Sequence, residues 1–275
     1  MSLLKVIMIG DVVGDPGLEV LENSLPSLIE QSDFVMVNGE NSADGFGLSE
    51  QSLERILKAG ADVVSSGNHV WEKRDFWPIL DTEKRILRPA NYSDGPGQGW
   101  IRIHKEIRGQ EYIFIAINLQ GRELMHLIDC PFRCFDKIYL DESGQNSISH
   151  KTLILVDFHA ESSREKEAFA FYLDGRASVV AGTHTHVQTA DEKILPKGTA
   201  YISDLGMTGV SGAVIGMEPK ICIDRARNQV LYRMEAAASS GSQDRRSLIQ
   251  GISVELDSES GKALDIKRIN LPSVL

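Results

Sequence analysis

Cysteine is scarce in this sequence, which holds only Cys130, Cys134 and Cys222 among 275 residues. An odd and sparse count argues against a disulfide framework and favours a reducing compartment. Cys130 and Cys134 could lie one helical turn apart, and we interpret them as reduced thiols near a helix. The N-terminal segment is too short and wrongly flanked for a signal peptide, so we expect a cytoplasmic protein.

An excess of basic residues is also missing, as are long apolar runs. The chain has 29 Lys and Arg against 39 Asp and Glu, for a formal net charge of −10. Without a basic stripe, an extended groove for nucleic acid is not expected, although bound metal could offset the acidic field for a small anion. No apolar run is long enough to cross a membrane, so we expect no membrane partner.

Nucleotide-binding fingerprints are absent from the first glycine-rich stretch. Residues 10–17 read "GDVVGDPG", which fits neither the G-x-G-x-x-G dinucleotide motif nor a phosphate loop ending in Lys and Ser or Thr. We therefore exclude both kinds of nucleotide cofactor site.

What the sequence does contain is an alternation of strand-like and helix-like runs. Helices are predicted from Pro16 to about Gln31, from the Ser49 cap to Gly60, and over residues 164–173. Strands are predicted over residues 3–9, 33–41, 61–69, 99–107, 111–118, 151–161 and 177–186, with a terminal hairpin over 250–270. The strand pair around Arg108–Gly109 is expected to be a hairpin, and residues 236–247 a flexible loop.

This order of elements predicts an α/β protein with two packed mixed sheets flanked by helices, a four-layer α/β/β/α sandwich. We expect residues 1–275 to form one domain. Ligands of open α/β sheets bind beyond the carboxyl ends of the strands. The candidate site is therefore expected in the loops at those ends.

Nearly every strand of the β-α part ends in side chains that can bind metal. They are Asp11, Glu40, Asn41, Asn68, His69, His159, His184 and His186. Oxygen and nitrogen ligands without thiolate suit Mn, Fe or Zn in a hydrolytic site. His184 and His186 are two residues apart, so both rings would point to one side of extended backbone. Glu40 can bridge two cations.

Each of these residues alone also has an ordinary structural explanation. A single histidine is more often hydrogen-bonded than metal-bound, Asp11 could be a loop or cap residue, and Asn41 or Asn68 could be turn residues. It is the joint pattern, at five strand ends, that makes the structural explanation improbable. His104, His126 and His150 lie outside this pattern, and we assign them no role.

Five motifs in this order, "GDVVG", "GEN", "GNH", "DFHAE" and "GTHTH", resemble the calcineurin-like binuclear metallophosphoesterases. The closer resemblance is to the bacterial YmdB-like subfamily. It rests on longer stretches such as "RPANY", "PFRCFD" and "DGRASVVAGTHTHVQTADEKILPKGTAYISDLGMTG", and it covers essentially the whole chain.

The resemblance implies a fold of two packed sheets and two divalent ions, with Fe or Mn favoured and Zn or Mg as alternatives. One ion would take Asp11, Glu40, Asn41 and His186, and the other Glu40, Asn68, His159 and His184. The wider superfamily begins with Asp-x-His, but here Val13 stands where that histidine would be. The resemblance implies that Asn41 replaces it.

The implied activity is hydrolysis of small phosphodiesters, chiefly 2′,3′-cyclic nucleotides, through a hydroxide that bridges the metals. His69 would stabilise the transition state and protonate the leaving ribose oxygen. Thr185, Gly206, Met207, Thr208 and Gly209 are candidates for shaping the substrate pocket, although a tight structural turn explains the glycine segment equally well.

Two other functions stay open at this point. One is a regulatory protein that binds a nucleotide or a protein partner and turns over slowly. The other is a phosphomonoesterase or phosphoprotein phosphatase. The family resemblance also implies a homo-oligomer, a dimer or a tetramer.

Overall fold

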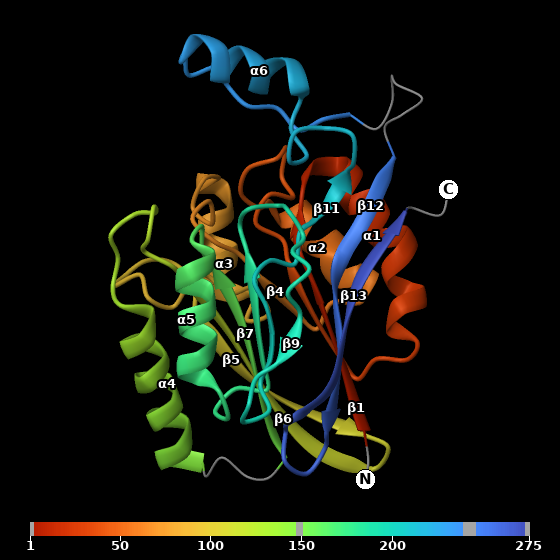
Figure 1. The fold of residues 1–275 in the computed structure, drawn as a ribbon, viewed down its shortest axis with the longest axis vertical. Coiled ribbons are helices and arrows are strands. Elements are labelled where there is room, and N and C mark those ends of the chain that lie inside the picture. Colours follow the sequence, from red (N-terminus) through yellow and green to blue (C-terminus); the bar gives the residue numbers. More distant parts are fainter. Residues whose placement is uncertain (1–2, 147–150, 239–245, 273–275) are drawn as a thin grey trace.

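The computed structural model describes residues 3–146, 151–238 and 246–272, and its two β-sheets pack between layers of helices (Figure 1). Helices α1 (Gly14–Ile29) and α2 (Glu50–Ala59) pack on one sheet, and α4 (Pro131–Asn146) and α5 (Ser163–Leu173) pack on the other. The α/β/β/α sandwich predicted from the sequence is therefore confirmed.

The first sheet has seven strands and contains both ends of the described chain. Its order is β2 (Asp11–Val12), β11 (Met207–Val210), β12 (Ser247–Asp257), β1 (Leu3–Ile9), β3 (Phe34–Asn38) and β4 (Val63–Ser65), with β13 (Ala263–Pro272) also paired to β12. Strands β1, β3 and β4 are parallel, and β12 and β13 form the predicted terminal hairpin.

The second sheet has six strands. Its order is β5 (Trp100–Ile107), β6 (Gln110–Gln120), β7 (Thr152–His159), β8 (Val179–Thr183), β10 (Ala200–Ile202) and β9 (Lys193–Ile194). The predicted hairpin joins β5 and β6, and φ is 51° at Arg108 and 76° at Gly109. Positive φ at both central residues is the geometry of a two-residue hairpin turn that matches the twist of the strands.

Strand β1 shows why the predicted strands read as unbroken apolar runs. Leu4, Val6 and Met8 face the core between the sheets, whereas Ile7 and Ile9 face the helices outside. Alternate side chains therefore enter two different cores, and both faces must be apolar.

Local sequence signals set the helix ends that were predicted. The Ser49 and Ser52 side chains form a reciprocal capping box at the start of α2, and Gly60 ends that helix in the left-handed conformation with φ 117°. The first helix begins at Gly14, two residues before the expected start at Pro16, and ends at Ile29, two residues before the expected end, and it contains Pro26. The third predicted strand is shorter than expected, because only β4 pairs in the sheet.

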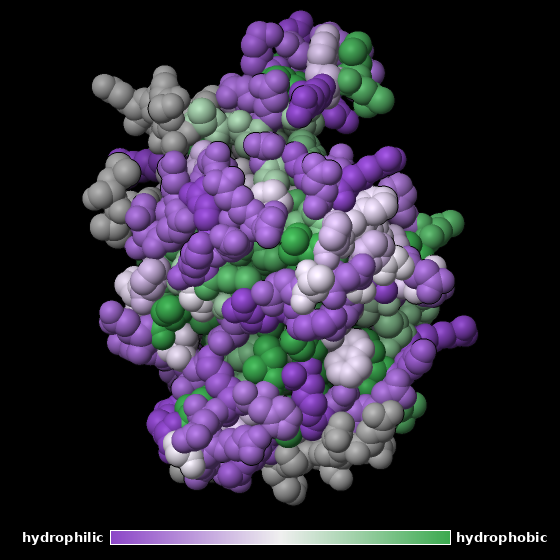
Figure 2. All heavy atoms as spheres, turned by 180° about the vertical axis from the view of Figure 1, so that it is seen from behind, coloured by the Kyte–Doolittle hydropathy of each residue, from purple (hydrophilic) through white to green (hydrophobic). Residues whose placement is uncertain are grey.

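Two short helices, η1 (Arg74–Phe76) and α3 (Trp77–Thr82), follow β4, whereas α6 (Pro219–Asn228) projects from the sandwich and has no buried residue (Figure 1). Figure 2 shows the same projection from behind, with polar and apolar residues mixed on its surface. Within the described ranges, no helix combines the length and apolar character needed to traverse a bilayer.

The structure describes only part of the loop predicted over residues 236–247. Residues 239–245 lie outside the described part of the chain, as does His150. Ala236 pairs with Met217 in an isolated bridge, and the Ala237 amide donates to the Gly216 carbonyl at 2.8 Å. The first residues of this segment are therefore fixed against the turn that precedes α6.

Candidate metal centre

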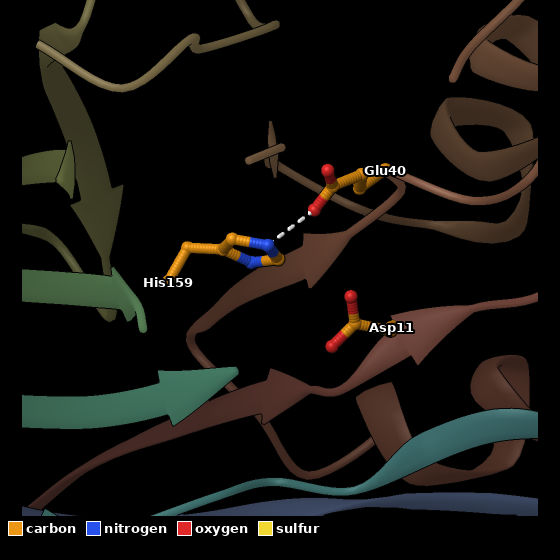
Figure 3. A group of neighbouring side chains, drawn as sticks. All are labelled: Asp11, Glu40 and His159. Atoms are coloured by element: carbon orange, nitrogen blue, oxygen red, sulfur yellow. Dashed lines mark ion pairs between the residues drawn. The ribbon is translucent and has the colours of Figure 1, made fainter. Parts of the chain in front are cut away.

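The parallel strands bring the predicted ligands to one end of the sandwich. Asp11 lies on β2, Glu40 and Asn41 follow β3, and His159 ends β7. Asp11, Glu40 and His159 are buried, and each offers a ligand atom within 4.8 Å of the others (Figure 3). Two carboxylates and an imidazole held this close form a natural site for a divalent cation.

The second half-site, which we define as Asn68, His159 and His184 with the shared Glu40, is tightly gathered. Atom Nε2 of His159 lies 2.7 Å from Glu40 Oε2, 3.1 Å from Asn68 Oδ1 and 3.0 Å from His184 Nδ1. Four donor atoms of different residues thus surround one small region. This is the arrangement expected of side chains that coordinate one ion.

The first half-site, Asp11, Asn41 and His186 with the same Glu40, is looser. His186 Nε2 lies 3.1 Å from Asn41 Nδ2 and 3.6 Å from Asp11 Oδ1. Asp11 Oδ1 and Asn41 Oδ1 are buried without a hydrogen-bond partner. Such orphaned acceptors are costly, by about 1–3 kcal/mol each, unless a cation satisfies them. Exchanging the amide oxygen and nitrogen of Asn41 would turn its oxygen toward His186.

Gly67 keeps the second half-site free of other side chains. A Cβ atom added there would lie 2.2 Å from Glu40 Oε2 and 2.3 Å from His159 Nε2. Any larger residue would therefore occupy the place where these two ligand atoms meet. Together with the oxygen and nitrogen donors, this space fits a divalent cation beside Glu40 and His159.

Each of the three histidines turns one ring nitrogen into the site and has the other held from outside. The outer contacts are His159 Nδ1 to Thr183 Oγ1 at 2.9 Å, His184 Nε2 to Glu161 Oε2 at 3.2 Å, and His186 Nδ1 to the Ile215 carbonyl at 2.9 Å. Outer partners of this kind fix the tautomer and the ring orientation of metal-binding histidines.

The predicted extended backbone of the "GTHTH" segment is wrong, although both histidines reach the site. Strand β8 ends at Thr183, and φ is 105° at His184 and 64° at His186. The buried Asp204 holds this unusual turn by accepting hydrogen bonds from the Thr185 amide at 3.1 Å and hydroxyl at 2.8 Å. Left-handed backbone, not alternation along a strand, aims the two rings.

A buried polar cluster lies beneath the second half-site, and the sequence did not predict it. The Asp157 carboxylate accepts hydrogen bonds from Ser65 at 2.5 Å, Thr183 at 2.6 Å and Asn38 at 2.9 Å. These residues come from both sheets, and the Thr183 hydroxyl also contacts His159 Nδ1 at 2.9 Å. Burial raises the pKa of Asp157 to about 6. A carboxylate inside the apolar run of β7 was the signal that could have revealed it.

Charge pairing sets the protonation of the candidate ligands. Burial acts to raise the pKa values of Asp11 and Glu40, but His186 and His159 overcome it, and both values lie below the ordinary range. Asp11 in turn raises the pKa of His186 to about 9 against the effect of burial. Burial and the charge of His159 lower the pKa of His184 to about 4. A bound cation would replace the extra proton on His186, whereas His184 is already neutral and ready to bind.

His69 lies beside the half-sites and not within them. Its backbone amide donates to Glu40 Oε1 at 2.5 Å, and its ring contacts the edge of Phe46 with 5.1 Å between centroids. The ring is about one third exposed, at 32%, and it lines a cavity of about 670 Å³ together with His184 and His186. The imidazole of His69 thus lines the same cavity as two of the candidate ligands.

Val13 stands directly beside Asn41. The two residues form a parallel bridge, and the Gly14 amide donates to the Asn41 carbonyl at 2.9 Å. The valine side chain is buried in a small cluster with Met207 and Met217. At the position where the superfamily resemblance expects a histidine, this chain therefore has a packing residue next to an amide.

The candidate substrate residues after β10 do not form a glycine-rich loop around a pocket. Met207 and Thr208 belong to the buried strand β11, which pairs with β2. Gly206 has φ 81°, and its carbonyl lies 2.2 Å from where a Cβ on Gly10 would be. A close approach of two backbones thus accounts for these glycines.

The fold and this site together define a hydrolase of the calcineurin-like metallophosphoesterase class, as the sequence motifs indicated. Within that class the chain belongs to the YmdB-like family, because the sequence model of the YmdB-like protein matches residues 7–269.

Similar proteins cover nearly the whole chain. A 2′,3′-cyclic-nucleotide 2′-phosphodiesterase of Bacillus subtilis (strain 168) is 38% identical over 269 residues, which are 97% of this chain and 96% of that protein. The crystal structure of a hypothetical protein from Thermus thermophilus has a TM-score of 0.86 at 36% identity and covers 98% of this chain and 100% of its own. That of a novel phosphatase from Mycoplasma pneumoniae has a TM-score of 0.88 at 30% identity, with 99% and 94% covered.

Proposed function

We propose that this chain is a phosphodiesterase that uses two divalent cations to hydrolyse small phosphodiesters, above all 2′,3′-cyclic nucleotides. The observation that carries the proposal is the clustering of Glu40, Asn68 and His184 around His159 Nε2, at 2.7–3.1 Å. The substrate class is supported by the name of the relative from Bacillus subtilis, with which nearly the whole chain aligns.

In this proposal Asp11, Asn41 and His186 hold one cation, Asn68, His159 and His184 hold the other, and Glu40 contacts both. Oxygen-rich ligands at the first half-site favour Fe or Mn over softer metals. Two such cations would activate water as the attacking hydroxide and neutralise charge on the phosphoryl oxygens. The residues around them must then orient the diester and supply a proton to the leaving group.

His69 is the residue best placed to supply that proton. Asn68 turns toward His159 in the second half-site, while the neighbouring His69 ring faces the cavity. Phe46 restrains the ring from one side, and Glu72 lies 3.4 Å from its Nδ1 atom. An imidazole held in this way can protonate the ribose oxygen as the cyclic phosphate opens.

We propose that residues 1–275 form one catalytic domain, which works in the cytoplasm as a dimer or a tetramer. The location rests on the three cysteines, which are all free thiols, and Cys134 lies one helical turn from Cys130 as expected. Light scattering and gel filtration of the purified chain would establish the oligomeric state.

The function is tested by loading the metal-free protein with Mn²⁺ or with Fe²⁺ under anaerobic conditions. Three substrates are then compared: 2′,3′-cyclic AMP, bis-p-nitrophenyl phosphate and p-nitrophenyl phosphate. We expect turnover of both diesters, with the cyclic nucleotide preferred and one monophosphate regioisomer as its product.

A variant outside the site serves as the control. His104 is exposed and pairs with Glu111 on the hairpin of the second sheet, so His104→Ala removes an imidazole without touching the candidate ligands. Turnover of the monoester alone would contradict the proposal and favour a phosphomonoesterase. Tight nucleotide binding with no turnover after metal loading would favour the regulatory alternative.

A further inference from the structure

The cavity next to the metal centre has two unlike walls. One wall consists of side chains of the site, among them His69, His184 and His186, whereas the other is formed by the segment that carries α6. Ile215, Met217 and Met234 make most of that second wall apolar, and Arg225 is the charged residue in it. The cavity volume of about 670 Å³ lies within the range of small-molecule sites, which is roughly 300–1,000 Å³.

Ile215 is the unusual residue of the apolar wall. It is β-branched but adopts a left-handed backbone with φ 51°, and it remains 44% exposed in the cavity. This conformation is strained for a β-branched residue and is normally left to glycine, asparagine or aspartate. Strain of this kind persists only where the surrounding structure imposes it, often at a functional site.

Hydrogen bonds fix the backbone of Ile215. Its carbonyl accepts the hydrogen bond from His186 Nδ1 at 2.9 Å. The flanking residues Val214 and Met217 exchange backbone hydrogen bonds at 3.1 and 2.9 Å, which close a two-residue turn with positive φ at both Ile215 and Gly216. Because the backbone alone holds this turn, packing in a core does not account for an isoleucine at this position.

We propose that the Ile215 side chain is part of a seat for the nucleobase of the substrate. The inference rests on the proposed function and adds where the base binds and which residue selects for it. A phosphate at the metal ligands would leave its nucleoside in the same cavity, against Ile215 and Met234. Apolar contact with the face of a base tolerates every base, so the seat selects nucleotides over base-free diesters.

The strain at Ile215 provides an unusually clean test. Glycine adopts φ near 51° without strain, and this relief offsets the greater freedom of glycine in the unfolded chain, so Ile215→Gly should remove the side chain with little change in melting temperature. Ile215→Asn keeps a side chain of similar length, tolerates the same backbone and is polar. The matched control is Ile223→Ala on α6, which removes an isoleucine of similar exposure, 52%, that does not line the cavity.

The measured quantity is the preference for a base, defined as kcat/KM for 2′,3′-cyclic AMP divided by kcat/KM for glycerol 1,2-cyclic phosphate. Both substrates contain a five-membered cyclic phosphate, but only the first has a base. We expect this ratio to fall about fivefold or more in both Ile215 variants, mainly through KM for the nucleotide, because apolar contact is lost. It should stay at the wild-type value in Ile223→Ala.

An unchanged ratio in both Ile215 variants, with metal content and melting temperature retained, would overturn the inference. If the wild-type protein hydrolyses neither substrate, the proposed function fails. Calorimetric binding of adenosine 3′-monophosphate then tests separately whether Ile215 contacts the base. Weaker binding in both Ile215 variants than in Ile223→Ala would support the seat, and equal binding would reject it.

Discussion

The two half-sites share Glu40, but they are built in different ways. The second half-site is backed by residues of both sheets, since His159 contacts Thr183, which in turn donates to the buried Asp157. The first half-site depends on the projecting segment, because the outer nitrogen of His186 is held by the Ile215 carbonyl. Its Asp11–His186 contact is also longer, at 3.6 Å.

If two cations bind as proposed, the sheets would fix one of them and the turn before α6 would fix the other. The second half-site should then bind its ion more tightly than the first. The first should be the position through which the substrate-binding wall and the metal centre influence each other. Six substitutions, taken in four groups, test this comparison from the largest expected effect to the smallest.

The largest effect is expected from Glu40→Gln, because both half-sites use this carboxylate. Both ions should be lost, and kcat/KM for 2′,3′-cyclic AMP should fall by more than about 10³-fold, since metal stabilisation of the transition state is worth several kcal/mol. Metal content is measured by mass spectrometry after loading, and circular dichroism checks the fold. Full occupancy of either half-site would show that Glu40 does not join them.

Replacing His69 separates metal binding from turnover beside the second half-site. We expect His69→Ala to keep both ions but to lower kcat for 2′,3′-cyclic AMP by about 10²–10⁴-fold, the usual contribution of general acid catalysis. Hydrolysis of bis-p-nitrophenyl phosphate should suffer less, because its leaving group needs no proton. An equal loss with both diesters, or a loss of metal, would contradict the role of His69.

The two asparagines form a matched pair, one in each half-site. Asn41→Ala should lower affinity for the first ion, and Asn68→Ala affinity for the second, each by more than the ~10–100-fold typical of outer partners. We expect Asn41→Ala to lose its ion more completely, because the remaining donors of the second half-site stay within 2.7–3.0 Å of His159 Nε2. Stepwise metal titration followed by calorimetry measures both affinities. Equal loss from both half-sites in either variant would refute the assignment.

The smallest effects concern the outer partners of the second half-site. Thr183→Val should weaken its metal affinity by about 10–100-fold. It should also destabilise the fold by about 1–3 kcal/mol, because Asp157 loses a buried donor. Glu161→Gln should do less, under about tenfold, since water can replace the half-exposed Glu161 carboxylate at His184. A larger effect of Glu161→Gln than of Thr183→Val, measured by urea unfolding and metal titration, would reverse this order.

Several elements could be predicted because their signals are local. The Ser49 cap, the Gly60 terminus and the Arg108–Gly109 turn are all set by a few neighbouring residues. The strand ends could be found as well, since polar side chains interrupt apolar runs there. The extended "GTHTH" backbone was mispredicted because Asp204, a residue distant in the sequence, imposes the turn at Thr185.

By itself the sequence determined the order of strands and helices, the ligand types at the strand ends, and the replacement of a histidine by Val13. Only the tertiary structure decided how these parts meet. It set Val13 beside Asn41, brought Asp157 of β7 to Ser65 of β4, and placed Ile215 where its carbonyl holds His186. The physical reason is that buried hydrogen bonds and left-handed turns depend on partners far away in the chain, which no local pattern records.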